Sequence, residues 1–118
     1  MSNTTTSRPA ALRSQHVCEA GGLSGEPLFR LSTSVLARAY ILARGRLVLI
    51  GVGGVSTGVQ ALTKLRAGAS LVQLYTAFAY SGPALIPRLK QELVACMRRA
   101  GFPRVQDAVG SDAQHLAE

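Results

Sequence analysis

The stretch LVLIGVGGVSTGVQALTKLRAGASLVQLYTA, residues 47–77, decides the fold. Its first residues, 47–50, form a short apolar run that predicts a strand buried on both faces. The glycines of GVGG follow, and apolar residues then recur at helical spacing before a second apolar run at 70–75 predicts another strand. Strand, glycine turn, helix and strand make one βαβ unit, and the two strands of such a unit are parallel.

The helix of this unit has signals at both ends. Ser56 is a residue type that caps helix starts, and Gly68 stands where a left-handed C-terminal cap belongs. A helix that begins beyond a glycine turn points N–H groups and its positive dipole end at the turn, which predicts an anion site, most often for phosphate. Tyr75 and Thr76, at the end of the second strand, would add donors. The glycines alone leave a second interpretation open, a tight turn without a ligand, because their spacing fits neither the Rossmann nor the Walker fingerprint.

Composition predicts a globular chain of at most one domain. The chain has 118 residues, 47% of them hydrophobic, and a mean hydropathy of +0.21. Apolar runs end well before the ~18 residues of a transmembrane helix, and the polar residues after Met1 show no signal peptide or other targeting signal. Cys18 and Cys96 are far apart and lack a CxxC partner, so we predict reduced thiols and no metal site.

The net charge of +7 raises the question of a nucleic-acid partner. Basic residues gather toward the C-terminus at Arg88, Lys90, Arg98, Arg99 and Arg104. Yet of the three tyrosines and three phenylalanines only Phe102 lies within this run, and no RNA- or DNA-binding motif is present. We therefore interpret the run as a solvated helix face and predict no nucleic-acid partner, with the remaining charge available to steer anionic ligands.

Further elements are expected on both sides of the central unit. Residues 1–20 are polar and aperiodic, which predicts a long loop. A helix is expected from Pro27 to Arg44-Gly45, and a final helix from Gly82-Pro83 to Gly101. Their predicted apolar stripes are Leu28, Leu31, Val35, Leu36, Ala39 and Tyr40 in the first, and Leu85, Ile86, Leu89, Leu93, Val94 and Met97 in the second. Residues 111–118 are predicted to be a frayed polar tail.

This α/β alternation contains only two strands, so both outer edges of the sheet would be unpaired. The sequence therefore predicts part of an α/β protein, with residues 1–110 as one unit and 111–118 as its tail.

Four segments together carry a family resemblance. They are SNTTTSRP (2–9), GGLSGEPL (21–28), IGVGGVSTG (50–58) and RAGASLVQLYTA (66–77). In order and spacing they closely resemble the C-terminal part of class 2 dihydroorotate dehydrogenase, the quinone-dependent flavoenzyme of pyrimidine biosynthesis, and the resemblance reaches to about Gly110. It implies a TIM (β/α)8 barrel with FMN at its C-terminal mouth, of which this chain would supply the last two strands and their helices.

The resemblance also assigns roles to residues. It implies FMN contacts at Ser2, Gly25, Gly54, Tyr75 and Thr76. Asn3 and Thr4 match the pair that binds dihydroorotate or its product orotate, and an amide with a hydroxyl offers the donors and acceptors that a ring bearing carbonyls and N–H groups requires. The implied activity is oxidation of dihydroorotate to orotate with a quinone acceptor. The implied location is peripheral to the inner membrane, on its cytoplasmic side in bacteria.

No catalytic residue is expected within this chain. In the family's order the proton-abstracting serine, the lysine beside the flavin and the helices that meet membrane and quinone all precede these segments. Ser24 and Ser56 are not substitutes, and Cys18 falls in the long loop without a base partner. The remaining candidates are lone histidines, His16 and His115.

Three hypotheses follow from the sequence. The first is the FMN-phosphate and orotate-binding part of a dihydroorotate dehydrogenase, active only within a longer chain. The alternative is an inactive truncated or split-gene remnant. A small basic binding module rests on charge alone. The coding sequence upstream of Met1 would separate the first two hypotheses.

Overall fold

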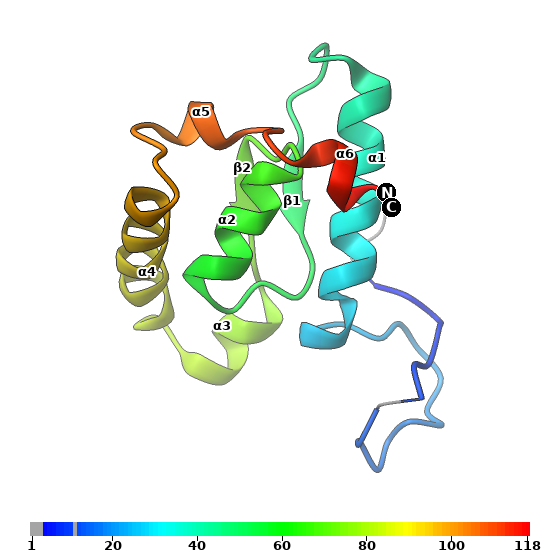
Figure 1. Ribbon diagram of the computed structural model, residues 1–118. Coiled ribbons are helices and arrows are strands. Elements are labelled where there is room, and N and C mark those ends of the chain that lie inside the picture. The colour runs from blue at the N-terminus through cyan, green and yellow to red at the C-terminus, as the bar shows by residue number, and fades with distance from the viewer. Residues whose placement is uncertain (1–3, 11) are drawn as a thin grey trace.

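The computed structural model describes residues 4–10 and 12–118. The elements are, in order, η1 (Glu26–Leu28), α1 (Phe29–Ala43), β1 (Ile50–Val52), α2 (Gly58–Arg66), β2 (Leu71–Gln73), α3 (Thr76–Ser81), α4 (Leu85–Arg99), α5 (Val105–Ala108) and α6 (Ala113–Leu116). Figure 1 shows α2 in the centre, with α4 and α1 on its two sides. The fold is α/β, with one two-stranded parallel sheet in the described part of the chain.

The two strands and α2 form the predicted βαβ unit. The strands pair in parallel, in the register Ile50 to Leu71, Gly51 to Val72 and Val52 to Gln73. The apolar run predicted that the first strand begins at Leu47, but it begins at Ile50. Leu47 and Val48 are 65% and 76% exposed. Pairing reaches back only to Leu49, whose carbonyl accepts from the N–H of Ser70 at 2.8 Å.

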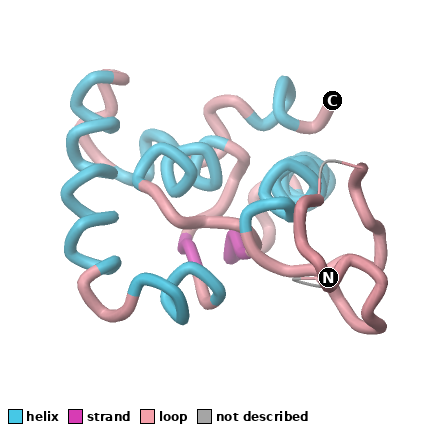
Figure 2. The backbone as a smooth tube through the Cα atoms, turned by 90° about the horizontal axis from the view of Figure 1, so that it is seen from below, coloured by secondary structure: helices cyan, strands magenta, loops and turns pink. Residues whose placement is uncertain are grey.

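One face of the sheet is covered and the other is open. A Cβ at Gly51 would lie 3.0 to 3.2 Å from the side chains of Ala69, Lys64 and Leu36, and Figure 2 shows α2 covering one side of the strands. On the other face Ile50 and Leu71 are 52% and 60% exposed. The prediction that the first strand is buried on both faces is therefore wrong for this chain, because no described element covers the second face.

The long helices bury narrower faces than the predicted stripes. The buried residues of α1 are Thr33, Leu36, Ala37 and Ala43. Leu31 and Val35, which the stripe included, are exposed and line a groove along β1. In α4, Ile86 and Val94 are likewise exposed. Leu31, Val35 and Ile86 line grooves beside the strands, which accounts for their exposure. Val94 instead lies between Lys90 and Arg98 in a groove on α4 itself.

The interior is centred on the packing of α2 against α4. The buried cluster there consists of Leu62 and Leu65 from α2, Cys96 and Met97 from α4, and Ala108 from α5. Gly58, at the start of α2, permits the close approach, since a Cβ there would lie 2.4 Å from Cβ of Glu92. α4 thereby brings a charged side chain to the first turn of α2.

The C-terminal residues are folded and do not form the predicted frayed tail. α6 lies against α1 (Figure 1), and Ala113 is buried. Arg38 Nε donates to the carbonyl of Ala117 at 3.0 Å, and Arg66 pairs with Asp112 at 3.1 Å. Although the segment is polar in composition, Leu116 and Ala117 pack against the buried cluster that contains Leu36 and Ala37 of α1.

The ends of the helices agree with the sequence analysis in part. Gly68 adopts a φ of 111° directly beyond α2, as predicted. The N-cap of α2 is Thr57 rather than Ser56, because Thr57 Oγ1 accepts from the N–H of Gln60 at 3.3 Å. The short helix α3 fills a stretch, between the second apolar run and Gly82-Pro83, to which the sequence assigned no element. No helix in the described ranges is long and apolar enough to cross a membrane.

Candidate functional site

A cavity of about 600 Å³ lies where β1 and β2 end. Parallel strands bring their carboxyl ends to the same edge of a sheet, so the loops that follow them meet there. The lining residues that the sequence analysis singled out are Thr4, Gly25, Gly54, Tyr75 and Thr76. Ser2 and Asn3 lie outside the described residues. The structure thus gathers five of the seven predicted positions around one cavity.

The N-terminal segment reaches this cavity because it is tied to the GGLSG turn. Thr5 and Leu23 exchange two backbone hydrogen bonds, of 3.1 and 2.7 Å. The Arg8 guanidinium donates to the carbonyl of Gly21 at 2.9 Å and so closes the loop between the two segments. These bonds place Thr4 at the cavity wall. Every acceptor in these contacts is a backbone carbonyl, which explains why the polar, aperiodic sequence of the loop gave no hint of the connection.

Gly25 and Thr76 meet across the cavity wall. Gly25 has a φ of 85°, and a Cβ there would lie 3.2 Å from Cγ2 of Thr76. Thr76 Oγ1 lies 3.5 Å from Ser24 Oγ, to which it donates. Thr76 opens α3, where a helix leaves its first N–H groups unpaired. Tyr75, just before it, is 80% exposed.

The loop after β1 presents backbone donors at the cavity. Gly53 and Gly54 have φ values of 101° and 75°, which favour glycine. Within the described part of the chain, the N–H groups of Gly53, Gly54 and Val55 donate to no acceptor. Successive backbone N–H groups in such conformations form concavities that bind anions. The loop can therefore hold a small anionic group.

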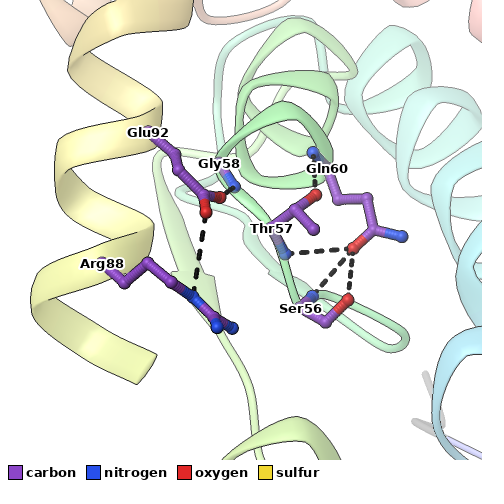
Figure 3. A network of polar contacts seen from close by, with 6 residues as sticks. All are labelled: Ser56, Thr57, Gly58, Gln60, Arg88 and Glu92. Atoms are coloured by element: carbon purple, nitrogen blue, oxygen red, sulfur yellow. Dashed lines mark hydrogen bonds and ion pairs between the residues drawn. The ribbon is translucent and has the colours of Figure 1, made fainter. Parts of the chain in front are cut away.

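The N-terminus of α2 does not contribute in the way the sequence analysis predicted. Figure 3 shows Glu92 of α4 at the first turn, where its carboxylate accepts from the N–H of Gly58 at 2.8 Å. Gln60 Oε1 accepts from the N–H groups of Ser56 and Thr57, at 2.8 and 3.2 Å. The N–H groups of Ser56 and Thr57, just before the helix, and of Gly58, its first residue, are thus satisfied from within the chain. Of the predicted free helix donors, only the N–H of Val59 keeps no acceptor in the described part of the chain, and Val59 does not line the cavity. The glycine loop, residues 53–55, takes the place of the helix donors at the cavity.

The charges around the cavity are sparse. Glu26 is the one acidic residue among the described lining residues, and none of them is basic. The net charge of +7 therefore does not act at the cavity through a lining side chain. An anion bound here would depend on neutral donors, chiefly backbone N–H groups and hydroxyls.

Two serines lie at the cavity, whereas both histidines and Cys18 are exposed elsewhere. Ser24 and Ser56 line the cavity, and Ser56 donates its hydroxyl to Gln60 Oε1 at 2.9 Å. His16 Nδ1 lies 2.6 Å from Glu19 Oε1 in the exposed loop. Cys18 is exposed in the same loop, and His115 lies on the exposed side of α6. Neither serine hydroxyl has a hydrogen bond to a histidine or a carboxylate among the described residues, so neither is activated as a nucleophile or base.

A family profile described as dihydroorotate dehydrogenase matches residues 1–97. The chain is 62% identical over 113 residues to dihydroorotate dehydrogenase (quinone), mitochondrial, of Oryza sativa subsp. japonica, covering 95% of this chain and 24% of that protein. It is 57% identical over 112 residues to dihydroorotate dehydrogenase (quinone) of Azorhizobium caulinodans, covering 95% of this chain and 32% of that protein.

A solved structure is similar as well. The crystal structure of ligand-free dihydroorotate dehydrogenase from Eimeria tenella matches with a TM-score of 0.90 and 44% sequence identity, over 93% of this chain and 30% of that one. The chain thus spans about a quarter to a third of the length of the relatives that it matches.

Proposed function

Because this chain belongs to the dihydroorotate dehydrogenase family, we propose that it supplies the part of a quinone-dependent enzyme that binds the FMN phosphate and the orotate ring. One observation carries the proposal. The N–H groups of Gly53, Gly54 and Val55 lie at a cavity without an acceptor among the described residues. A phosphate is the group that such a set of backbone donors binds best.

The residues at the cavity fit a phosphate monoester. The glycine loop supplies N–H groups from one side, and Thr76 supplies a hydroxyl and its own N–H from the other. Gly25 leaves room beside Thr76, where a side chain would crowd Cγ2. Tyr75 completes the set of FMN contacts in the proposal, together with Ser2 from outside the described residues. When bound, FMN accepts the hydride that leaves dihydroorotate.

Asn3 and Thr4 are proposed to bind the pyrimidine ring. Thr4 lies at the wall of the same cavity, held there by the pairing of Thr5 with Leu23. An amide and a hydroxyl together donate to ring carbonyls and accept from ring N–H groups. Their role is to orient dihydroorotate so that its reacting carbon faces the cofactor.

The remainder of the enzyme is proposed to complete a TIM barrel around this part. The open face and free edges of the two-stranded sheet are where further strands would pair and pack. In this proposal the catalytic base, the quinone site and the attachment to the inner membrane lie in that remainder, and no metal takes part.

The proposal is tested in a hybrid enzyme. Residues 1–118 replace the matching segment of the Azorhizobium caulinodans relative, which is 57% identical. In this hybrid, Asn3→Ala should leave flavin content unchanged and weaken orotate binding. Leaving a polar group of a buried ligand unpaired costs about 1–3 kcal/mol, so the orotate dissociation constant should rise roughly 5- to 150-fold. Flavin difference spectra during an orotate titration measure it.

Thr6→Ala is the matched control, because Thr6 is an exposed residue of the same segment that does not line the cavity. Its orotate dissociation constant should equal that of the unmodified hybrid. An unaltered constant in Asn3→Ala would refute the substrate role of this segment.

A further inference from the structure

A fully buried lysine lies behind the glycine loop. Lys64 is 0% exposed although it belongs to a residue type that is almost never buried without a partner. Its stem runs from α2 beneath β1, where a Cβ at Gly51 would lie 3.1 Å from Cβ of Lys64. A side chain at that position of the strand would crowd this passage.

The ammonium group has neutral neighbours. Lys64 Nζ donates to Ser32 Oγ on α1 at 2.6 Å, and it lies 5.0 Å from the ring centroid of Phe29. No described carboxylate forms an ion pair with it. Burial lowers the pKa of Lys64 to about 8, so that the charged form still predominates at pH 7. A buried charge without a counter-ion is costly and calls for a compensating role.

Ser32 connects Lys64 to the glycine loop, because it accepts from Lys64 and its own hydroxyl donates to a carbonyl. An ammonium group cannot accept, so the Ser32 hydroxyl proton must point to another acceptor. Two carbonyls are within reach, that of Phe29 at 3.0 Å and that of Gly53 at 3.1 Å. The Phe29 carbonyl already accepts from Thr33 Oγ1 at 2.6 Å. The Gly53 carbonyl therefore is the better acceptor for Ser32.

This hydrogen bond fixes the orientation of one peptide unit. In a trans peptide the carbonyl of Gly53 and the N–H of Gly54 point in opposite directions. Ser32 lines the groove along β1, whereas Gly54 lines the candidate phosphate cavity. A carbonyl drawn toward Ser32 thus turns the N–H of Gly54 away from that groove.

We infer that Lys64 is a positioning residue for the phosphate of FMN. Acting through Ser32, it holds the peptide between Gly53 and Gly54 with the N–H toward the cavity, and it places a buried positive charge behind donors that are otherwise neutral. The phosphate, in turn, supplies the negative charge that the buried ammonium lacks. This inference rests on the proposed function of the cavity.

The test compares FMN with riboflavin, which lacks the phosphate. Dissociation constants for both are measured by flavin fluorescence with the flavin-free hybrid enzyme. Lys64→Met keeps the length of the buried stem and should weaken FMN binding about tenfold, while riboflavin binding should change by less than about twofold. Ser32→Ala, which breaks the relay, should act in the same direction. Lys90→Met removes the same charge from an exposed position on α4 and should leave both constants unchanged.

The outcomes separate the two claims. If Lys64 only stabilised the fold, Lys64→Met would weaken the binding of FMN and of riboflavin by the same factor. That result, which leaves the preference for FMN unchanged, would overturn the inference. If Lys64→Met does not fold, the same comparison in Ser32→Ala decides. An unmodified hybrid that binds riboflavin as tightly as FMN would instead contradict the proposed phosphate site itself.

Discussion

Residues 1–118, expressed alone and supplied with FMN, should show no oxidation of dihydroorotate by a quinone acceptor. The chain spans 24% to 32% of the curated relatives described above, and in the proposed enzyme the catalytic base lies in the remaining part. General-base catalysis contributes roughly 10²- to 10⁴-fold to a rate. The larger loss is that of the cofactor, because this chain contributes only part of the contacts proposed for FMN.

The exposed surface supports the same expectation. Apolar side chains on the open side of the sheet and beside it, Val48, Ile50 and Leu71, are 76%, 52% and 60% exposed. A two-stranded sheet with one bare face is marginal in water, and large apolar patches favour association. We therefore expect the isolated chain to aggregate or to remain loosely packed.

The measurement is a quinone-reduction assay on the purified chain, with the hybrid enzyme as the positive control. The same preparation from cells carrying an empty vector gives the background of the host enzyme. Turnover above that background would contradict the account and require an oligomer or second chain that completes the site. An inactive hybrid that is folded and contains flavin would favour the remnant hypothesis.

Gly54→Ala should yield hybrid enzyme that purifies without flavin. A Cβ at Gly54 would not enter the cavity. It would lie 2.7 Å from the N, Cα and Cβ atoms of Phe29, at the start of α1. Backbone cannot move aside as a flexible side chain does, so the loop must shift and carry its donors away from the phosphate. The left-handed conformation costs about 1–2 kcal/mol with alanine, and overpacking adds about 1–3 kcal/mol.

Gly101→Ala is the control, because it separates backbone strain from the contact with α1. Gly101 has a φ of 77°, against 75° for Gly54, and a Cβ there would meet nothing within 4 Å. The free energy of unfolding of Gly101→Ala should fall by about 1–2 kcal/mol, the cost of alanine in the left-handed conformation. The variant should keep its flavin. Flavin absorbance per chain and thermal unfolding measure both variants. Normal flavin content in Gly54→Ala would disprove the role of the loop.

Local patterns were sufficient to predict the centre of the fold. The apolar runs, the glycine turn and Gly68 predicted the βαβ unit and its parallel strands, which the structure contains. They misplaced the first strand because an apolar run does not show where a pairing partner begins. They also missed α6, whose contact with α1 joins residues far apart in the chain.

The interactions at the site were harder to predict for the same reason. Glu92 caps the first turn of α2 from 34 residues away, and no local pattern indicates such a contact. Lys64 has the polarity of a solvent-facing residue, and its burial depends on the space left by Gly51 and on Ser32 of another helix. The one available signal was a lysine directly before Leu65, on the buried side of an amphipathic helix.

The most direct test of the account is a crystal structure of the hybrid enzyme with FMN and orotate. Phosphate oxygens should accept from the N–H groups of Gly53, Gly54 or Val55 and from Thr76, at about 2.7–3.2 Å, with the Gly53 carbonyl still accepting from Ser32. A phosphate held elsewhere, with these loop N–H groups bonded to water or to other protein groups, would contradict the account.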